Sequence, residues 1–79
     1  MRLHIKYYAK YREAAGRKEE EIELDKATVS QLLDFLRTRY PGLKNEKSSI
    51  VAVNSRFAKE DDPLSEGDVV SIFPPVSGG

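Results

Sequence analysis

Residues 28–40 read TVSQLLDFLRTRY, and this stretch decides the fold. Thr28, followed three positions later by Gln31, forms a capping box, a pairing that satisfies the first free N–H groups of a helix. The apolar residues that recur at helical spacing and form one stripe are Val29, Leu32, Leu33, Leu36 and Tyr40. Pro41-Gly42 ends the helix, because proline biases the preceding residue away from helical angles. A helix with one apolar stripe needs a second layer to cover it.

Four segments with strand character can supply that layer. Residues 2–8 (RLHIKYY) alternate with period two, and 18–25 (KEEEIELD), 49–58 (SIVAVNSRFA) and 68–74 (DVVSIFP) also read as strands. The residues expected to face inward are Leu3, Ile5, Tyr7, Ile22, Leu24, Val51, Val53, Val70 and Ile72. The order of elements predicts an α+β roll, with one sheet covered on one face by one main helix.

The connections between these segments are short. Residues 11–16 (YREAAG) offer about one helical turn closed by Gly16, so the first two strands can pair as a wide hairpin. Asn54-Ser55 is expected to form a turn, and residues 61–68 (DDPLSEGD) a polar loop.

The composition restricts the function of this 79-residue chain. Thirteen basic and 13 acidic residues cancel, which argues against nucleic acid as a main partner, because phosphate binding uses clustered Lys and Arg. No apolar run approaches the roughly 20 residues of a membrane-spanning helix, and residues 1–10 lack the apolar centre of a signal peptide, so we expect no membrane contact and a cytoplasmic domain. The absence of cysteine excludes disulfides and thiolate nucleophiles.

Catalytic side chains are scarce. His4, the one histidine, occupies a polar position of its alternating strand and is expected on the solvent side. Glu19, Glu20 and Glu21 are expected to form a solvated strand edge. We expect no metal site, because one histidine and no cysteine leave only carboxylates as ligands. The two acidic stretches, 18–25 (KEEEIELD) and 59–62 (KEDD), lack the alternating oxygen ligands of an EF-hand loop. The sequence predicts no self-sufficient active site and no bound cofactor.

The last seven residues, 73–79 (FPPVSGG), carry the most distinctive pattern. Pro74-Pro75 fixes φ and removes two N–H donors, so it ends sheet pairing and projects the chain as a stiff rod. We therefore divide the chain into a domain over residues 1–74 and an extended tail over residues 75–79.

Gly78-Gly79 suits a reactive end that enters a narrow channel of another protein, because glycine has no side chain to obstruct it. A terminal carboxylate on Gly79 would be ionised at neutral pH and able to attack the α-phosphate of a nucleotide. The product would be an acyl-adenylate, from which sulfur or nitrogen nucleophiles can take the acyl group.

Four blocks of the sequence together resemble a known family. FPPVSGG (73–79), YYAKYREAAG (7–16), AVN (52–54) and PLSEGDVVSIFPP (63–75) are similar to the small, sulfur-carrying subunit of molybdopterin synthase, in the ubiquitin-like β-grasp family. The likeness covers essentially the whole chain. It implies a mixed sheet of about four to five strands, one main helix on one face and a flexible C-terminal tail.

The resemblance also implies a sulfur-transfer cycle in molybdenum cofactor biosynthesis. An adenylyltransferase of the ubiquitin-activating type adenylates Gly79 with ATP and magnesium, and a sulfurtransferase converts it to a thiocarboxylate. The large catalytic subunit of molybdopterin synthase then receives the tail, in an expected heterotetramer, and the sulfur passes to cyclic pyranopterin monophosphate. The chain itself is then a non-catalytic sulfur donor. The residues implied in tail insertion are Pro74, Pro75, Val76, Ser77 and Gly78.

A docking surface is expected beside the tail. By alternation Tyr8 and Phe73 lie on the sheet face away from the helix, and Phe57, just after the Asn54-Ser55 turn, is expected to join them. Alternatively, Tyr8 merely covers the edge of the core. Arg12 is either a contact for the activating enzyme or a solvated surface residue.

Three other functions stay open. A sulfur carrier for thiazole and thiamine synthesis has the same fold and terminal chemistry, but its tail typically lacks the Phe-Pro-Pro run. A ubiquitin-like protein modifier would instead attach Gly79 to a lysine of a target protein. A plain interaction module would have an inert tail.

Overall fold

A five-stranded sheet and one long helix make up the fold in the computed structural model, which describes residues 1–43 and 49–74. The elements in chain order are β1 (Arg2–Tyr7), α1 (Lys10–Ala15), β2 (Glu19–Glu23), α2 (Val29–Arg39), the 3-10 helix η1 (Pro41–Leu43), β3 (Ile50–Val53), β4 (Arg56–Phe57) and β5 (Val69–Phe73). The proposed tail, residues 75–79, lies outside the described residues.

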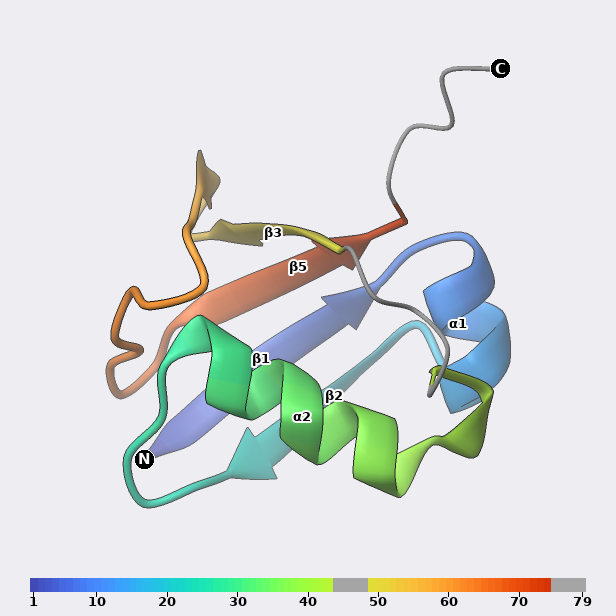
Figure 1. The fold of residues 1–79 in the computed structure, drawn as a ribbon, viewed down its shortest axis with the longest axis horizontal. Helices are drawn as coiled ribbons and strands as arrows, with labels where there is room; N and C mark the ends of the chain where they lie inside the picture. The colour runs from blue at the N-terminus through green and yellow to red at the C-terminus, as the bar shows by residue number, and fades with distance from the viewer. Residues whose placement is uncertain (44–48, 75–79) are drawn as a thin grey trace.

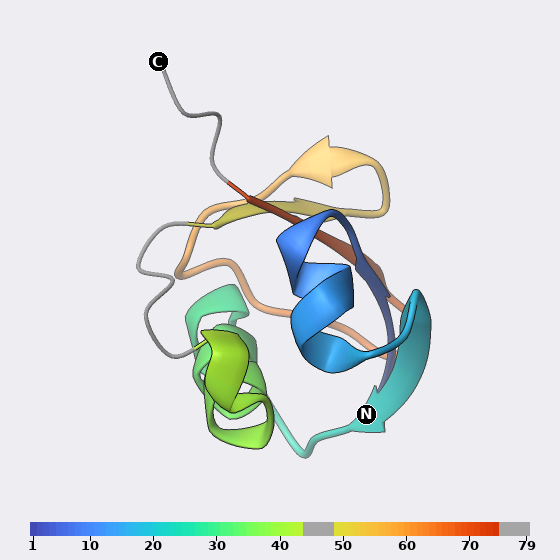
Figure 2. The same cartoon turned by 90° about the vertical axis from the view of Figure 1, so that its right-hand side faces the viewer.

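The sheet is mixed, with strand order β2-β1-β5-β3-β4. β1 pairs antiparallel with β2, which confirms the predicted wide hairpin, and parallel with β5 at the centre of the sheet. β3 pairs antiparallel with both β5 and β4. Figure 1 shows α2 crossing in front of the strands, and Figure 2 shows it lying on one face of the sheet, with α1 at the end of β1. These observations confirm the predicted α+β roll.

The core fills the space between this face and α2. Its members from the strands and α2 are Leu3, Ile5, Tyr7, Ile22, Val51, Val70, Ile72, Val29, Leu32, Leu33 and Leu36. Leu24 and Val53, also expected to face inward, are half-buried and pack against the core. The alternation and the helical stripe therefore predict the core well, because each is set by the geometry of its own element.

Both predicted ends of α2 are confirmed. The hydroxyl of Thr28 accepts a hydrogen bond from the Gln31 N–H (3.3 Å), and the Gln31 side chain accepts one from the Thr28 N–H (2.9 Å). At the other end Tyr40 is extended, directly before Pro41. The first two N–H groups of α2 donate to backbone carbonyls of the loop over residues 61–68 and its neighbour Glu60, so this loop is attached to the helix.

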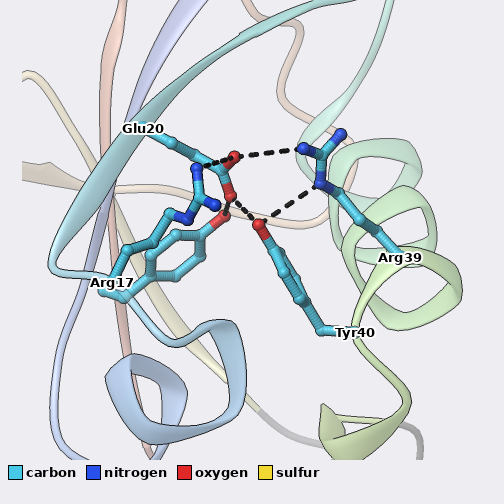
Figure 3. A network of polar contacts seen from close by, with 5 residues as sticks. Arg17, Glu20, Arg39 and Tyr40 are labelled. Carbon is cyan, nitrogen blue, oxygen red and sulfur yellow. Dashed lines mark hydrogen bonds and ion pairs between the residues drawn. The ribbon is translucent and has the colours of Figure 1, made fainter.

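Glu20 contradicts the prediction that Glu19, Glu20 and Glu21 form a solvated edge. The alternation of β2 turns Glu20 toward the core face, where its side chain is only 5% exposed. Its carboxylate accepts a hydrogen bond from the hydroxyl of Tyr7 (2.6 Å). It accepts a second from the hydroxyl of Tyr40, as Figure 3 shows. This carboxylate therefore joins β1 and β2 to the end of α2.

Two arginines complete the cluster around Glu20. Guanidinium nitrogens of Arg17 and Arg39 each lie 3.5 Å from its Oε1 atom (Figure 3). Burial alone would raise the pKa of Glu20, but the hydrogen bonds from Tyr40 and Tyr7 and the two positive charges outweigh it and lower that pKa. Burial, followed by the hydrogen bond to Glu20, raises the pKa of Tyr7. Glu20 thus stays ionised and Tyr7 stays protonated, as the hydrogen bond from the hydroxyl to the carboxylate requires.

Replacing Glu20 with glutamine should reduce the free energy of unfolding at pH 7 by about 1–3 kcal/mol, because the buried hydroxyls lose a charged acceptor. The folded-state pKa of Glu20 lies below its ordinary value of 4.5, so its contribution is present above about pH 4.5 and disappears as the pH falls through the folded-state pKa. Denaturant unfolding of both proteins from pH 7 to pH 3 should show the difference shrinking in acid.

Glu21→Gln is the matched control, because Glu21 is on the same strand but exposed, and its carboxylate makes a surface ion pair with Arg2 (3.6 Å). Its effect should stay within about 0.5 kcal/mol. Equal losses for the two variants would contradict the assigned role of Glu20.

Candidate functional site

The sheet face away from α2 has an apolar half and a charged half. The register places Phe73 opposite Ile50, while Ala52 pairs with both Ser71 and Phe57. Since residues two apart on a strand share a face, Ile50, Ala52, Phe57 and Phe73 all lie on this outer side. The apolar half therefore spans β5, β3 and β4.

Tyr8, Phe57 and Phe73, here called the aromatic patch, are brought together as predicted. Tyr8 and Phe73 stack with ring centroids 4.4 Å apart, and both are half-buried. Phe57 is 84% exposed, the one large apolar side chain of the described residues that is so open to solvent. The three residues line a shallow apolar hollow together with Ala9, Ile50 and Pro74. Exposed apolar surface of this kind on a small domain is typical of a binding site.

Charged residues occupy the other half of the face, on β1 and β2. Arg2 lies 3.6 Å from both Glu21 and Glu23, and Nε2 of His4 lies 2.6 Å from Oε1 of Glu19. His4 is thus on the outer side, as predicted, and its partner is a neighbouring carboxylate. An apolar area bordered on one side by charged residues is compatible with a protein interface, in which polar groups lie at the rim.

The turn that carries Phe57 has a specific geometry. Asn54 and Ser55 both have positive φ, 51° and 71°, as a two-residue type I′ hairpin turn requires. The Asn54 side chain donates to Asp68 (2.9 Å) and accepts from the Val69 N–H (2.9 Å), which ties the turn to the start of β5. The Asn-Ser pair predicted the turn, but nothing in the sequence indicated these long-range bonds.

Ala9 is a feature that the sequence reasoning missed. Its φ of 52° and ψ of −127° lie in a region that normally only glycine occupies. Such a conformation costs about 1–3 kcal/mol when the residue has a Cβ atom. Ala9 lies directly after Tyr8 and lines the apolar hollow, so the strain occurs at the candidate site.

Two more predicted site residues have defined places. Pro74 follows the end of β5, is half-buried and lines the hollow, so the last residue before the predicted tail lies at the aromatic patch. Arg12 is exposed on α1. The remaining predicted tail residues lie outside the described part of the chain, namely Pro75, Val76, Ser77, Gly78 and Gly79.

Within residues 1–43 and 49–74, no group of three His, Cys, Asp or Glu side chains is placed to hold a metal ion. No helix in those ranges is long and apolar enough to span a membrane. The described part of the candidate site is the apolar hollow beside Pro74.

Comparison with known proteins agrees with this geometry. The Molybdopterin synthase sulfur carrier subunit of Chlamydomonas reinhardtii is 37% identical, with all of both chains covered, and the Small archaeal modifier protein 3 of Haloferax volcanii is 35% identical over the same shares. The solved structure of the putative molybdopterin converting factor, subunit 1, from Pyrococcus furiosus has a TM-score of 0.86 and 37% identity, covering 96% of this chain and 99% of that one. Residues 5–79 match the ThiS family, and the chain belongs to that family.

Proposed function

We propose that this chain carries sulfur for molybdenum cofactor biosynthesis, as a thiocarboxylate on Gly79 that is used within molybdopterin synthase. The observation that supports this most directly is the aromatic patch at Pro74, the residue that follows β5 and precedes PVSGG in the sequence. The relatives named sulfur carrier subunits and the ubiquitin-like fold agree with it.

The proposed chemistry takes place on partner enzymes. The Gly79 carboxylate attacks the α-phosphate of ATP, bound with magnesium on an adenylyltransferase, and pyrophosphate leaves. A sulfurtransferase then supplies a persulfide sulfur that displaces AMP, and reductive cleavage of the S–S bond by a thiol leaves the thiocarboxylate. In the synthase the sulfur moves to cyclic pyranopterin monophosphate, and water returns Gly79 to a carboxylate.

The aromatic patch is the proposed docking surface for the large catalytic subunit. Its exposed ring and shallow hollow lie beside Pro74, so a protein that covers them also receives the start of the tail. Binding there would bury Phe57, whose exposure is otherwise unfavourable in water. The charged border on β1 and β2 would set the orientation.

Protein modification is the second candidate, because one relative at 35% identity is named a small archaeal modifier protein. Both functions begin with the same acyl-adenylate. They differ in the final acceptor, which is a pterin in one and a lysine side chain in the other.

Intact-mass measurement of the chain isolated from its own cells separates these functions. A sulfur carrier should show a fraction whose mass corresponds to one oxygen replaced by sulfur, and fragmentation should place the change on Gly79. A modifier should leave Gly-Gly remnants on lysines of other proteins. A mature chain that continues beyond Gly79, with no exposed Gly-Gly end, would contradict both.

Deletion of Gly79 should abolish molybdopterin formation in a reconstituted synthase assay. It should leave the melting temperature unchanged, because the core and sheet that the structure describes are formed by residues up to Phe73. The matched control is the full chain supplied with a chemically prepared terminal thiocarboxylate. Molybdopterin synthesis by the shortened chain would refute the terminal chemistry.

Replacing Phe73 with aspartate should weaken binding to the large subunit at least about 30-fold, because a charge would then face an apolar surface. Phe73→Leu keeps an apolar contact and should weaken binding much less. Calorimetric titration of both variants, after circular dichroism has verified their folding, tests this. Wild-type affinity in both would remove Phe73 from the interface.

A further inference from the structure

We infer that the methyl group of Ala9 is a contact of the docking surface, present although it strains the backbone. The inference rests on the proposed function, since its partner is the apolar surface of the large synthase subunit. It adds a residue that contributes to partner specificity.

The strain at Ala9 has a definite form. The Tyr11 N–H donates to the Tyr8 carbonyl (3.0 Å), which closes a turn with Ala9 at its first central position. The φ and ψ of Ala9, 52° and −127°, match a type II′ turn, where that position normally takes glycine. Asn54 and Ser55, the other non-glycine residues with positive φ in the described ranges, form a hairpin turn in which such angles are usual.

The surrounding fold holds this turn from both sides. The Tyr8 N–H donates to the Ile72 carbonyl (3.3 Å), and the Ala9 carbonyl accepts from the N–H groups of Arg12 (3.0 Å) and Glu13 (3.3 Å). Tyr7 and Tyr11, on either side, are 1% and 2% exposed. Any residue at position 9 must therefore adopt these backbone angles.

The described core does not use the Ala9 methyl group. Ala9 is exposed and is absent from the buried cluster and from the residues that pack against it. It instead lines the hollow between the aromatic patch and Pro74. Glycine would adopt the angles of this turn without strain. We therefore assign the methyl group of Ala9 a contact with the large subunit, which fills the hollow when it binds.

Ala9→Gly should raise the melting temperature by a few degrees, because relief of the strain exceeds the added flexibility of the unfolded chain. It should nevertheless weaken binding to the large subunit about four-fold, the effect of one buried methyl group. Ser55→Gly is the matched control, because it also places glycine at a positive φ but lies outside the hollow. It should raise the melting temperature and leave the affinity unchanged.

A chain assembled by peptide ligation with D-alanine at position 9 separates contact from rigidity. D-alanine accepts positive φ and restricts the backbone, but it directs its methyl group elsewhere. Affinity as weak as that of Ala9→Gly supports the contact, whereas wild-type affinity in the D-alanine chain or in Ala9→Gly overturns it. A wild-type chain that does not bind the large subunit would instead refute the proposed function.

Discussion

The parallel pairing of β1 with β5 is the constraint on which the rest of the structure depends. It places Tyr7 beside Ile72 at the centre of the sheet, although 65 positions separate them in sequence. The residues that follow each of these, Tyr8 and Phe73, then face the other side together and stack. The pairing therefore builds the core on one face and the aromatic patch on the other.

The core face and the outer face of the sheet meet at the peptide bond between Tyr7 and Tyr8, because successive residues of a strand point to opposite faces. Tyr7 turns inward and its hydroxyl donates a hydrogen bond to Glu20, while Tyr8 turns outward and stacks on Phe73. Because Glu20 also binds Tyr40 at the end of α2, the helix holds the end of β1 in position. The buried carboxylate of Glu20 thus fixes Tyr7, the residue directly before Tyr8 of the aromatic patch, and it lies on the core face of the sheet. Its pKa is lowered, although burial alone would raise it, because Tyr40 and Tyr7 donate hydrogen bonds to it and Arg39 and Arg17 are positively charged.

The sequence predicted most of the fold, because periodicity and capping are local properties. The capping box at Thr28, the inward positions of β1 and the pair of turn residues at Asn54-Ser55 were all readable from neighbouring residues. The same alternation predicted the outward positions of Tyr8 and Phe73, and Phe57 was expected beside them because it follows the Asn54-Ser55 turn. The burial of Glu20 was not predicted, because a carboxylate is expected in solvent even where alternation with Ile22 points it inward, and the hydroxyls that make its burial possible lie 13 and 20 residues away. Neither was Ala9, since an alanine gives no sign of positive φ.

A carrier with a reactive end must bind several partners in turn. Its binding surface must therefore be shared by these partners and must release each of them. Pro74, the last residue before the proposed tail, lines the hollow, so under the proposed function each enzyme that handles the tail must approach this hollow and their binding is mutually exclusive. A surface of three aromatic side chains and a charged border favours exchange over permanent association, because a small interface releases its partner readily. Single groups at the rim of the hollow can then change the affinity by small amounts. The methyl group of Ala9 is the proposed example. The proposed carrier function therefore requires both a stable core between the sheet and α2 and weak contacts on the opposite face of the sheet.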